Sequence, residues 1–341
     1  MGGLVQQGRK VGKPALPTVV VAPNAFKETF SPHEAARLIA RGLRRALQFK
    51  ARLLLMPVAD GGDGTLDALR AFLGGRLVTL PVTGPLGTPV RASYLRSGGT
   101  AVIEMARASG LKLVPPARRD PLVTTTRGTG ELIAHAFRHG ARKVLLGVGG
   151  SATVDGGAGA LEVVTPGMAR RITVLCDVDN PLLGPRGAAR VFGPQKGATP
   201  EMVRLLEGRL ADGAAELRRR TGVDVRRMRG GGAAGGLSAG LAAHGARLVG
   251  GAEFILRTVG FPPRPCDFVV TGEGRVDRTS LGGKAVGTVI RLSPAPVVIV
   301  CGRCELPRLA AFETGDRAPE ALVRAAERAG RWIKARLGGG R

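Results

Sequence analysis

Four short apolar runs in this chain of 341 residues each lead directly into a turn that combines glycine with carboxylates. The four segments are 53–64, 144–157, 172–181 and 268–277. Short continuous apolar runs are typical of strands buried on both faces of a parallel sheet. Ligands of open α/β sheets bind beyond the carboxyl ends of such strands. Asp and Gly also fill ordinary tight turns, but four such turns together predict an α/β fold with a composite site on strand ends.

Strands and helices alternate along most of the chain. Apolar runs predict strands at 18–22, 53–58, 143–148, 267–271 and 296–301. Helical spacing predicts helices at 32–48, 65–73, 129–139, 157–163, 200–220, 233–244, 283–292 and 318–337. The first of these helices has a strong start, because Ser31, Pro32 and Glu34 form the sequence pattern of a capping box.

The sequence pattern changes between residues 76 and 105, where short runs of alternating apolar and polar residues predict antiparallel or mixed strands. We therefore predict a doubly wound parallel-sheet domain, interrupted by a second, mixed α/β domain inserted in it. The predicted boundaries give a discontinuous first domain of residues 17–73 and 262–341 and an inserted domain of residues 74–261. The active site is expected in the cleft between them.

The chain has a formal net charge of +25, which raises nucleic acid as a partner. Only nine of the 51 basic residues are Lys, and the Arg residues are scattered singly and in pairs rather than clustered. This dispersion favours solvated surfaces over a nucleic-acid groove, so a basic nucleic-acid-binding protein is the weaker alternative. The Lys residues that remain in glycine-rich turns, Lys27, Lys196 and Lys284, are candidates for a specific contact with an anion.

No apolar stretch approaches the ~18 residues of a membrane span, and the first 17 residues contain no apolar signal core. The expectation is a cytoplasmic protein with no membrane partner. A homo-oligomer is compatible with the sequence. Four Cys residues in a chain of this length do not indicate a disulfide scaffold.

The chemistry of the turns indicates phosphoryl transfer. The chain contains neither a Walker phosphate loop nor the glycine fingerprint of dinucleotide-binding folds. It does combine glycine turns, scarce Lys residues and an excess of Asp and Glu. Phosphoryl transfer uses N–H groups and Lys for phosphate oxygens, carboxylates for Mg²⁺, and one acid to accept a hydroxyl proton.

Eight segments resemble, in order, the signatures of the bacterial type I glycerate kinases. They are 22–28, 57–65, 83–87, 127–132, 149–153, 176–182, 192–198 and 271–277. The resemblance covers about residues 18–302. It implies ATP-dependent, Mg²⁺-assisted phosphorylation of D-glycerate, with 2-phosphoglycerate favoured over 3-phosphoglycerate as the product. It also implies two α/β domains, the second inserted in the first.

This chain departs from the family pattern in four places. Val154 stands where the family usually has Asn, and Asp63 stands where it has Glu. The connection from Leu161 to Arg171 is shorter than usual, and the segment after Cys304 is abbreviated as well. The short connection leaves open a second hypothesis, a catalytically impaired homologue that binds nucleotide or glycerate in a regulatory role.

Site roles follow from the chemistry of each turn. Lys27 is the first candidate for a catalytic contact with the phosphates. Asp60 and Asp63 are candidate metal ligands together with Glu273, and Asp60 is also a candidate catalytic residue. Gly272, Glu273 and Lys284 are expected to bind ATP, together with Lys27.

The glycerate side of the site is assigned to other turns. Ser151 and Thr153 are candidates to bind a carboxylate or phosphate, with Asp155 as a catalytic acceptor of a proton. Arg127 is a candidate partner of the glycerate carboxylate. Asp179 and Asn180 are candidate substrate-binding residues as well. The segment Asp-x-Asp-Asn-Pro that contains them also suits an ordinary turn.

Overall fold

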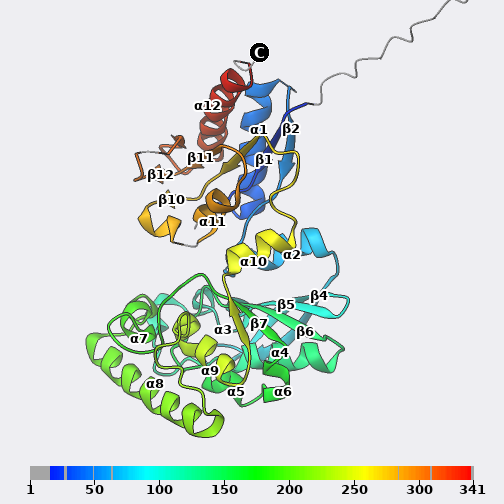
Figure 1. Ribbon diagram of the computed structural model, residues 1–341. Helices are drawn as coiled ribbons and strands as arrows, with labels where there is room; N and C mark the ends of the chain where they lie inside the picture. The colour runs from blue at the N-terminus through cyan, green and yellow to red at the C-terminus, as the bar shows by residue number, and fades with distance from the viewer. Residues whose placement is uncertain are drawn as a thin grey trace, which may run out of the picture.

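The computed structural model describes residues 16–26, 29–48, 50–62, 64–282, 284–307 and 309–338. Lys27 and Asp63, two of the predicted site residues, lie outside these described residues. Figure 1 shows the architecture, in which two sheets lie one above the other with helices α2 and α10 between them.

The upper sheet contains five parallel strands from the two ends of the chain. Its spatial order is β13-β11-β9-β1-β2. The strands are β1 (Thr18–Val21), β2 (Arg52–Leu55), β9 (Phe268–Thr271), β11 (Val297–Cys301) and β13 (Ala311–Glu313). The chain moves outward in one direction from β1 to β2 and in the other from β9 to β13, so the topological switch point lies between β1 and β9.

Helices cover both faces of this sheet because successive strand residues point to opposite sides. Val19 and Val21 pack against α1 (Pro32–Leu47) and α12 (Pro319–Gly338). Val20 packs on the other face, against α10 (Gly251–Thr258) and α11 (Ala285–Leu292). The predicted capping box at the start of α1 is present, with the Ser31 and Glu34 side chains each accepting from the other's backbone N–H.

The lower sheet has six strands in the order β3-β4-β5-β6-β7-β8. The β3–β4 and β4–β5 pairs are antiparallel, and the remaining pairs are parallel. The strands are β3 (Arg76–Thr83), β4 (Pro89–Ser97), β5 (Thr100–Glu104), β6 (Lys143–Gly147), β7 (Ile172–Leu175) and β8 (Arg247–Val249). A mixed sheet inserted between the halves of a doubly wound parallel sheet confirms the predicted fold class.

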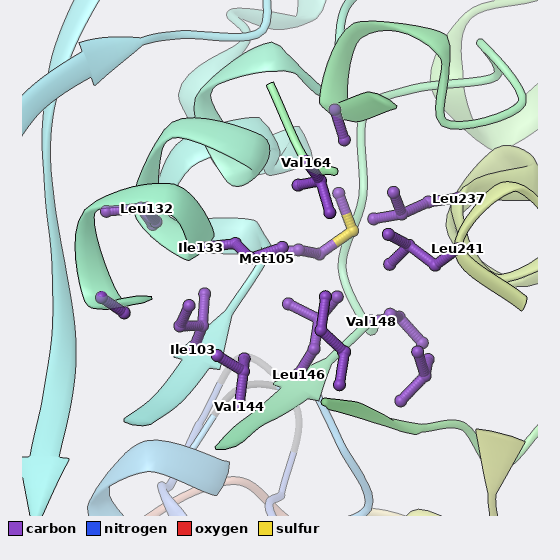
Figure 2. Packing of buried hydrophobic residues seen from close by; sticks show 14 of the residues in the cluster. Ile103, Met105, Leu132, Ile133, Val144, Leu146, Val148, Val164, Leu237 and Leu241 are labelled. Carbon is purple, nitrogen blue, oxygen red and sulfur yellow. The ribbon is translucent and has the colours of Figure 1, made fainter. Parts of the chain in front are cut away.

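The main core lies on one face of the six-stranded sheet. Figure 2 shows Met105 at its centre, surrounded by Ile133, Leu146, Val164 and Leu237. The helices that supply this core are α4 (Arg127–Arg138), α5 (Ala158–Leu161) and α9 (Leu237–Ala243), with α3 (Ala106–Ser109) at its edge. Full burial of each such aliphatic side chain contributes about 1.5–3 kcal/mol to folding.

The remaining elements are short or peripheral, apart from one long helix. They are η1 (Leu111–Leu113), η2 (Pro116–Arg118), α6 (Pro166–Ala169), α7 (Ala188–Phe192), η3 (Pro194–Lys196), α8 (Pro200–Thr221), η4 (Ala233–Gly236), β10 (Arg275–Val276), η5 (Arg278–Leu281) and β12 (Arg303–Cys304). In the described part of the chain, no helix has an apolar stretch long enough to cross a membrane.

Two helices join the sheets. Leu66 and Leu69 of α2 (Thr65–Leu73) pack on the six-stranded sheet, and Ile255 of α10 packs beside them. Ala252 and Leu256 of α10 belong to the core of the five-stranded sheet. Because α10 contributes to both cores, it fixes the position of one sheet against the other. The exact domain boundaries at residues 73 and 262 stay predictions.

Candidate active site

A pocket opens at the switch point of the five-stranded sheet. Its volume is about 530 Å³, and its wall combines the loop after β1 with the loop after β9. Ala25 and Phe26 come from the first loop, and Glu273 and Gly274 from the second. This is the position at which doubly wound sheets bind nucleotides. The predicted ATP-binding residues Glu273 and Lys284 both line this pocket.

Lys284, at the start of α11, contributes positive charge to the pocket, which Arg275 and Arg317 also line. Lys284 is the N-cap residue of this helix, and its Nζ donates a hydrogen bond to Thr279 Oγ1 at 3.1 Å. Asp277 caps η5 and contacts the same Thr279 hydroxyl, and hydrogen bonds from Thr279 hold the pKa of its carboxyl below the usual value. A helix N-terminus beside an ammonium group favours phosphate.

Gly272 joins this pocket to the next strand end. A Cβ atom at this position would lie 1.7 Å from the carbonyl oxygen of Val300, so only glycine fits between β9 and β11. The Gly272 carbonyl accepts a hydrogen bond from the Asn24 backbone at 2.8 Å. The side-chain amide of Asn24 in turn donates to Asp60 Oδ2 at 3.4 Å. Asn24 thus connects the predicted nucleotide loop to the predicted catalytic carboxylate.

A second carboxylate, Asp177, lies beside Asp60. Its Oδ2 accepts a hydrogen bond from the Ala252 N–H of α10 at 2.9 Å. Its Oδ1 is buried and has no hydrogen-bond partner among the described residues. Burial, and then the charge of Asp60, raise the pKa of Asp177 to about 7, against the opposing effect of the α10 N–H groups. The pair therefore forms a site of unbalanced negative charge where β2, β7 and α10 meet.

Carboxylates with an unsatisfied oxygen suit a hard cation such as Mg²⁺, which binds through one or two carboxylates with phosphate and water. Within the described ranges, no group of three or more His, Cys, Asp or Glu side chains is placed to hold a metal ion. A metal at Asp60 would consequently need ligands from phosphate and solvent as well.

The glycine turns bring the two sheets into contact. The Gly149 N–H donates to the Gly61 carbonyl at 3.0 Å, and a Cβ at Gly149 would lie 2.5 Å from the Cα of Gly62. The turn after β2 therefore packs directly on the turn after β6. Ser151 follows two residues later at the same end of β6.

Ser151 is paired with a buried lysine. Lys196 Nζ donates to Ser151 Oγ and to the Thr153 carbonyl, both at 2.8 Å. Only 3% of Lys196 is exposed, and burial lowers its pKa to about 7, while the charge of Asp155 opposes this shift. The Thr153 side chain is fully buried, and its hydroxyl donates to the Ala234 carbonyl at 3.5 Å.

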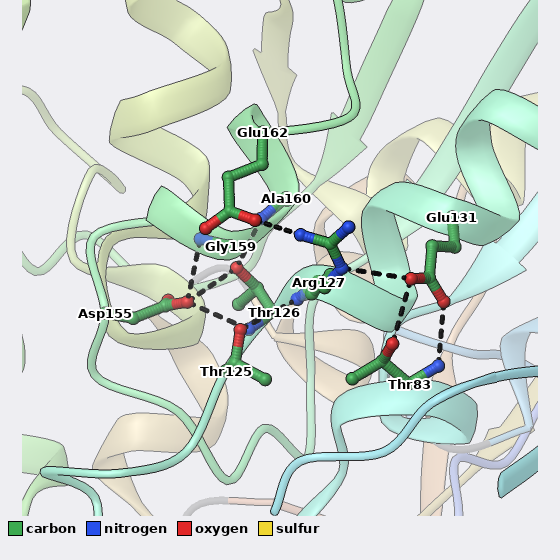
Figure 3. Close-up of polar contacts among 9 residues, drawn as sticks. All are labelled: Thr83, Thr125, Thr126, Arg127, Glu131, Asp155, Gly159, Ala160 and Glu162. Carbon is green, nitrogen blue, oxygen red and sulfur yellow. Dashed lines mark hydrogen bonds and ion pairs between the residues drawn. The ribbon is translucent and has the colours of Figure 1, made fainter. Parts of the chain in front are cut away.

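Figure 3 shows the surroundings of Asp155. Its Oδ2 accepts hydrogen bonds from the Thr126 N–H and hydroxyl at 2.8 and 2.7 Å and from the Gly159 N–H, and its Oδ1 accepts from the Gly157 N–H. The residue as a whole is partly exposed. Protein atoms packed around its carboxyl nevertheless keep water away from it, and this desolvation raises the pKa of Asp155. Both oxygens of this carboxylate are therefore already engaged within the protein.

Arg127 lies between two glutamates in the same view. Its guanidinium forms ion pairs with Glu131 and Glu162, and Glu131 also accepts two hydrogen bonds from Thr83. Asp179 and Asn180 lie on the loop after β7. There, Asp179 forms a bidentate ion pair with Arg229, and Asn180 donates to the Arg186 carbonyl.

The structure thus brings Asp60 to the carboxyl end of β2, Gly272 and Glu273 to that of β9, Ser151 to that of β6, and Lys284 to the start of α11. The functional roles predicted for these residues stay predictions, as do those of Arg127, Thr153, Asp155, Asp179 and Asn180, and of Lys27 and Asp63. The assignment from sequence gave no role to Asn24 or Asp177, and it named Lys196 only as a candidate for contact with an anion. All three stand in the recognised segments, and Lys196 carried a further signal as a Lys in an Arg-rich chain.

Comparison with known proteins agrees with this arrangement. The model of the glycerate kinase family matches residues 19–168 and 162–334. A glycerate kinase from Halalkalibacterium halodurans is 40% identical, over 90% of each chain. A glycerate 2-kinase from Escherichia coli K12 is 41% identical, over 83% of this chain and 84% of its own.

The same relationship appears in three dimensions. The crystal structure of a candidate glycerate kinase 2 from Salmonella typhimurium LT2 superimposes with a TM-score of 0.78 at 37% identity. The match covers 96% of this chain and 99% of the other. The chain therefore belongs to the glycerate kinase family of phosphotransferases.

Proposed function

We propose that this protein transfers the γ-phosphoryl group of ATP to D-glycerate and forms 2-phosphoglycerate. The observation that carries the proposal is the continuous series of contacts from the pocket to the six-stranded sheet. Asn24 joins Gly272 to Asp60, and the turn after Asp60 packs on Gly149. A phosphate bound at the first end of this series would point toward the second.

ATP is assigned to the pocket at the switch point. Lys284 and the start of α11 supply positive charge there, and Gly272 lets the loop after β9 pack closely on β11. In the sequence, Lys27 comes directly after Phe26, which lines this pocket. Its contact with the phosphates remains part of the proposal. Glycerate is assigned to the turn after β6, where Ser151 offers a hydroxyl. The reaction would then take place in the predicted cleft between the domains.

Mg²⁺ would be held by Asp60 with Glu273, and by Asp63 if the predicted role of that residue holds. When bound, it would neutralise the charge that develops on the transferring phosphoryl group. Among the described residues Asp60 accepts two hydrogen bonds, from the Gly62 N–H and the Asn24 side chain, which makes it the better candidate to accept the hydroxyl proton of glycerate. Asp155, the other predicted acceptor, already receives four hydrogen bonds.

The test measures phosphoryl transfer from ATP to D-glycerate directly. Purified protein is incubated with ATP, Mg²⁺ and D-glycerate, and the product is identified by phosphorus and carbon NMR. Accumulation of 2-phosphoglycerate supports the proposal. Exclusive formation of 3-phosphoglycerate contradicts the assigned regiochemistry. Binding of D-glycerate and ATP without any transfer would instead favour the regulatory homologue that the short 161–171 connection suggests.

A further inference from the structure

The pair formed by Lys196 and Ser151 has no assigned role in this chain beyond the predicted hydroxyl contact of Ser151 and the anion contact predicted in general terms for Lys196. Lys196 is held at the end of η3, which follows α7 directly. The next residue, Gly197, has a φ of +98°, and a Cβ there would lie 2.4 Å from the Arg119 carbonyl oxygen. The backbone at this turn is therefore closely constrained, and this constraint fixes the position of the Lys196 ammonium group.

The hydrogen-bond inventory of the pair leaves one donor available. Lys196 Nζ donates to Ser151 Oγ, so the hydroxyl oxygen acts as an acceptor in this contact. No described residue accepts the proton of the Ser151 hydroxyl. Ser151 lies after Gly149 and the exposed Gly150, at the end of β6 that contacts the turn of Asp60. A hydroxyl that receives a hydrogen bond from an ammonium group is a stronger donor to an anion.

The chemistry of the site indicates which anion this is. The phosphates of ATP are assigned to the other sheet, beside Lys284, whereas the carboxylate of glycerate needs a cation on the six-stranded sheet. Arg127 is compensated by two glutamates. Lys196 has one acidic neighbour whose charge reaches it, Asp155, and that carboxylate is occupied by the hydrogen bonds shown in Figure 3.

We infer that Lys196 is a positioning residue that acts through the Ser151 hydroxyl to bind the carboxylate of glycerate. This inference rests on the proposed substrate. It predicts that the two residues form one functional unit, because Lys196 is buried behind the serine. Removal of either side chain should weaken the same interaction, and removal of both should cost little more than removal of one.

The experiment measures binding of D-glycerate by calorimetry, with and without a non-hydrolysable ATP analogue, and then the KM values for both substrates. The variants are Lys196→Met, Ser151→Ala and the double variant. Met keeps the length and removes the buried charge, and Ala deletes only the hydroxyl. Lys143→Met is the matched control, since Lys143 is exposed at the opposite end of β6.

Each single variant should weaken D-glycerate binding by ~10–100-fold, the range expected for loss of a charge-assisted hydrogen bond. The KM for ATP and the control should change by less than about twofold, which is within ordinary scatter for a distant surface substitution. The double variant should bind no more than about threefold worse than the weaker single variant.

Several outcomes would overturn the inference. Multiplicative effects in the double variant would mean that the residues act separately, and an equal rise in the KM for ATP would place the pair at the phosphates. If Lys196→Met does not fold, unchanged D-glycerate binding in Ser151→Ala is sufficient to overturn the inference. A wild-type protein that binds no D-glycerate also overturns it. A wild type that binds D-glycerate but transfers no phosphate defeats only the proposed function.

Discussion

Asp177 lies beside Asp60, and Oδ1 of Asp177 is buried without a hydrogen-bond partner in the described part of the chain. The two residues come from different sheets, after β7 and β2 respectively. The α10 N-terminus stabilises the pair through the Ala252 N–H, but it does not balance two charges. The junction between the sheets is therefore electrostatically strained when both carboxylates are ionised and no cation is bound.

This relationship predicts a pH-dependent gain in stability for Asp177→Asn. The pKa of Asp177 is raised to about 7, chiefly by burial, from the model-compound value of 3.8. The folded protein thus binds more protons than the unfolded chain between these pH values, and the stability contribution of this group is lost as the pH rises toward 7. In chelator, the variant should melt a few degrees above wild type at pH 8, with a much smaller difference near pH 4.

The matched control is Asp67→Asn, because Asp67 is exposed in the first turn of α2. Its melting temperature should follow that of wild type at both pH values. A stability difference for Asp177→Asn that is the same at both pH values would mean that the buried charge is not its cause.

The proposed metal site predicts a requirement for a divalent cation. Turnover should cease in excess chelator and return on addition of Mg²⁺. Asp60→Asn should raise the Mg²⁺ concentration at half-maximal rate by ~10-fold or more, since loss of one charged ligand costs at least about 1.4 kcal/mol. Asp67→Asn again serves as the control. Full turnover in chelator, or an unchanged Mg²⁺ dependence in Asp60→Asn, would remove Asp60 from the metal site.

Gly272 provides a test of the packing at the switch point. A Cβ in Gly272→Ala would lie 1.7 Å from the Val300 carbonyl, so β9 and β11 must separate, at a cost of ~1–3 kcal/mol or more. Gly208→Ala is the opposite case, because Gly208 lies within α8 with open space around it. That variant should gain ~0.5–1 kcal/mol. Chemical denaturation measures both, and equal changes would contradict the close approach.

Much of the fold could be predicted from the sequence. The helix after Ser31 and the strands ending at the glycine turns carry strong local signals, namely a capping box and continuous apolar runs. β8 and α10 were not predicted. β8 has three residues, too few to show a period, and α10 begins at Gly250 and Gly251 without a side-chain cap. α10 has only eight residues, so its polar face, which carries the Glu253–Arg257 ion pair, gives a weak periodic signal.

The site could be predicted only in part, because the sequence shows which residues end a strand but not which of them meet. The motif around Asp177 looked equally like an ordinary turn until its contact with Asp60 was visible. Ser151 and Thr153 are two residues apart, yet the Lys196 ammonium group donates to the side-chain hydroxyl of Ser151 and to the backbone carbonyl of Thr153. These distinctions depend on side-chain direction and tertiary packing.

The central claim is that the two substrates bind on different sheets, ATP beside Lys284 and glycerate beside Ser151. The most direct test is a parallel measurement of both KM values in Lys284→Met and Ser151→Ala, with Lys143→Met as the common control. We expect Lys284→Met to raise the KM for ATP by ~10–100-fold and leave that for D-glycerate nearly unchanged, and Ser151→Ala to do the reverse. If both variants raise the same KM, or each raises both equally, the division of the substrates between the two sheets is wrong.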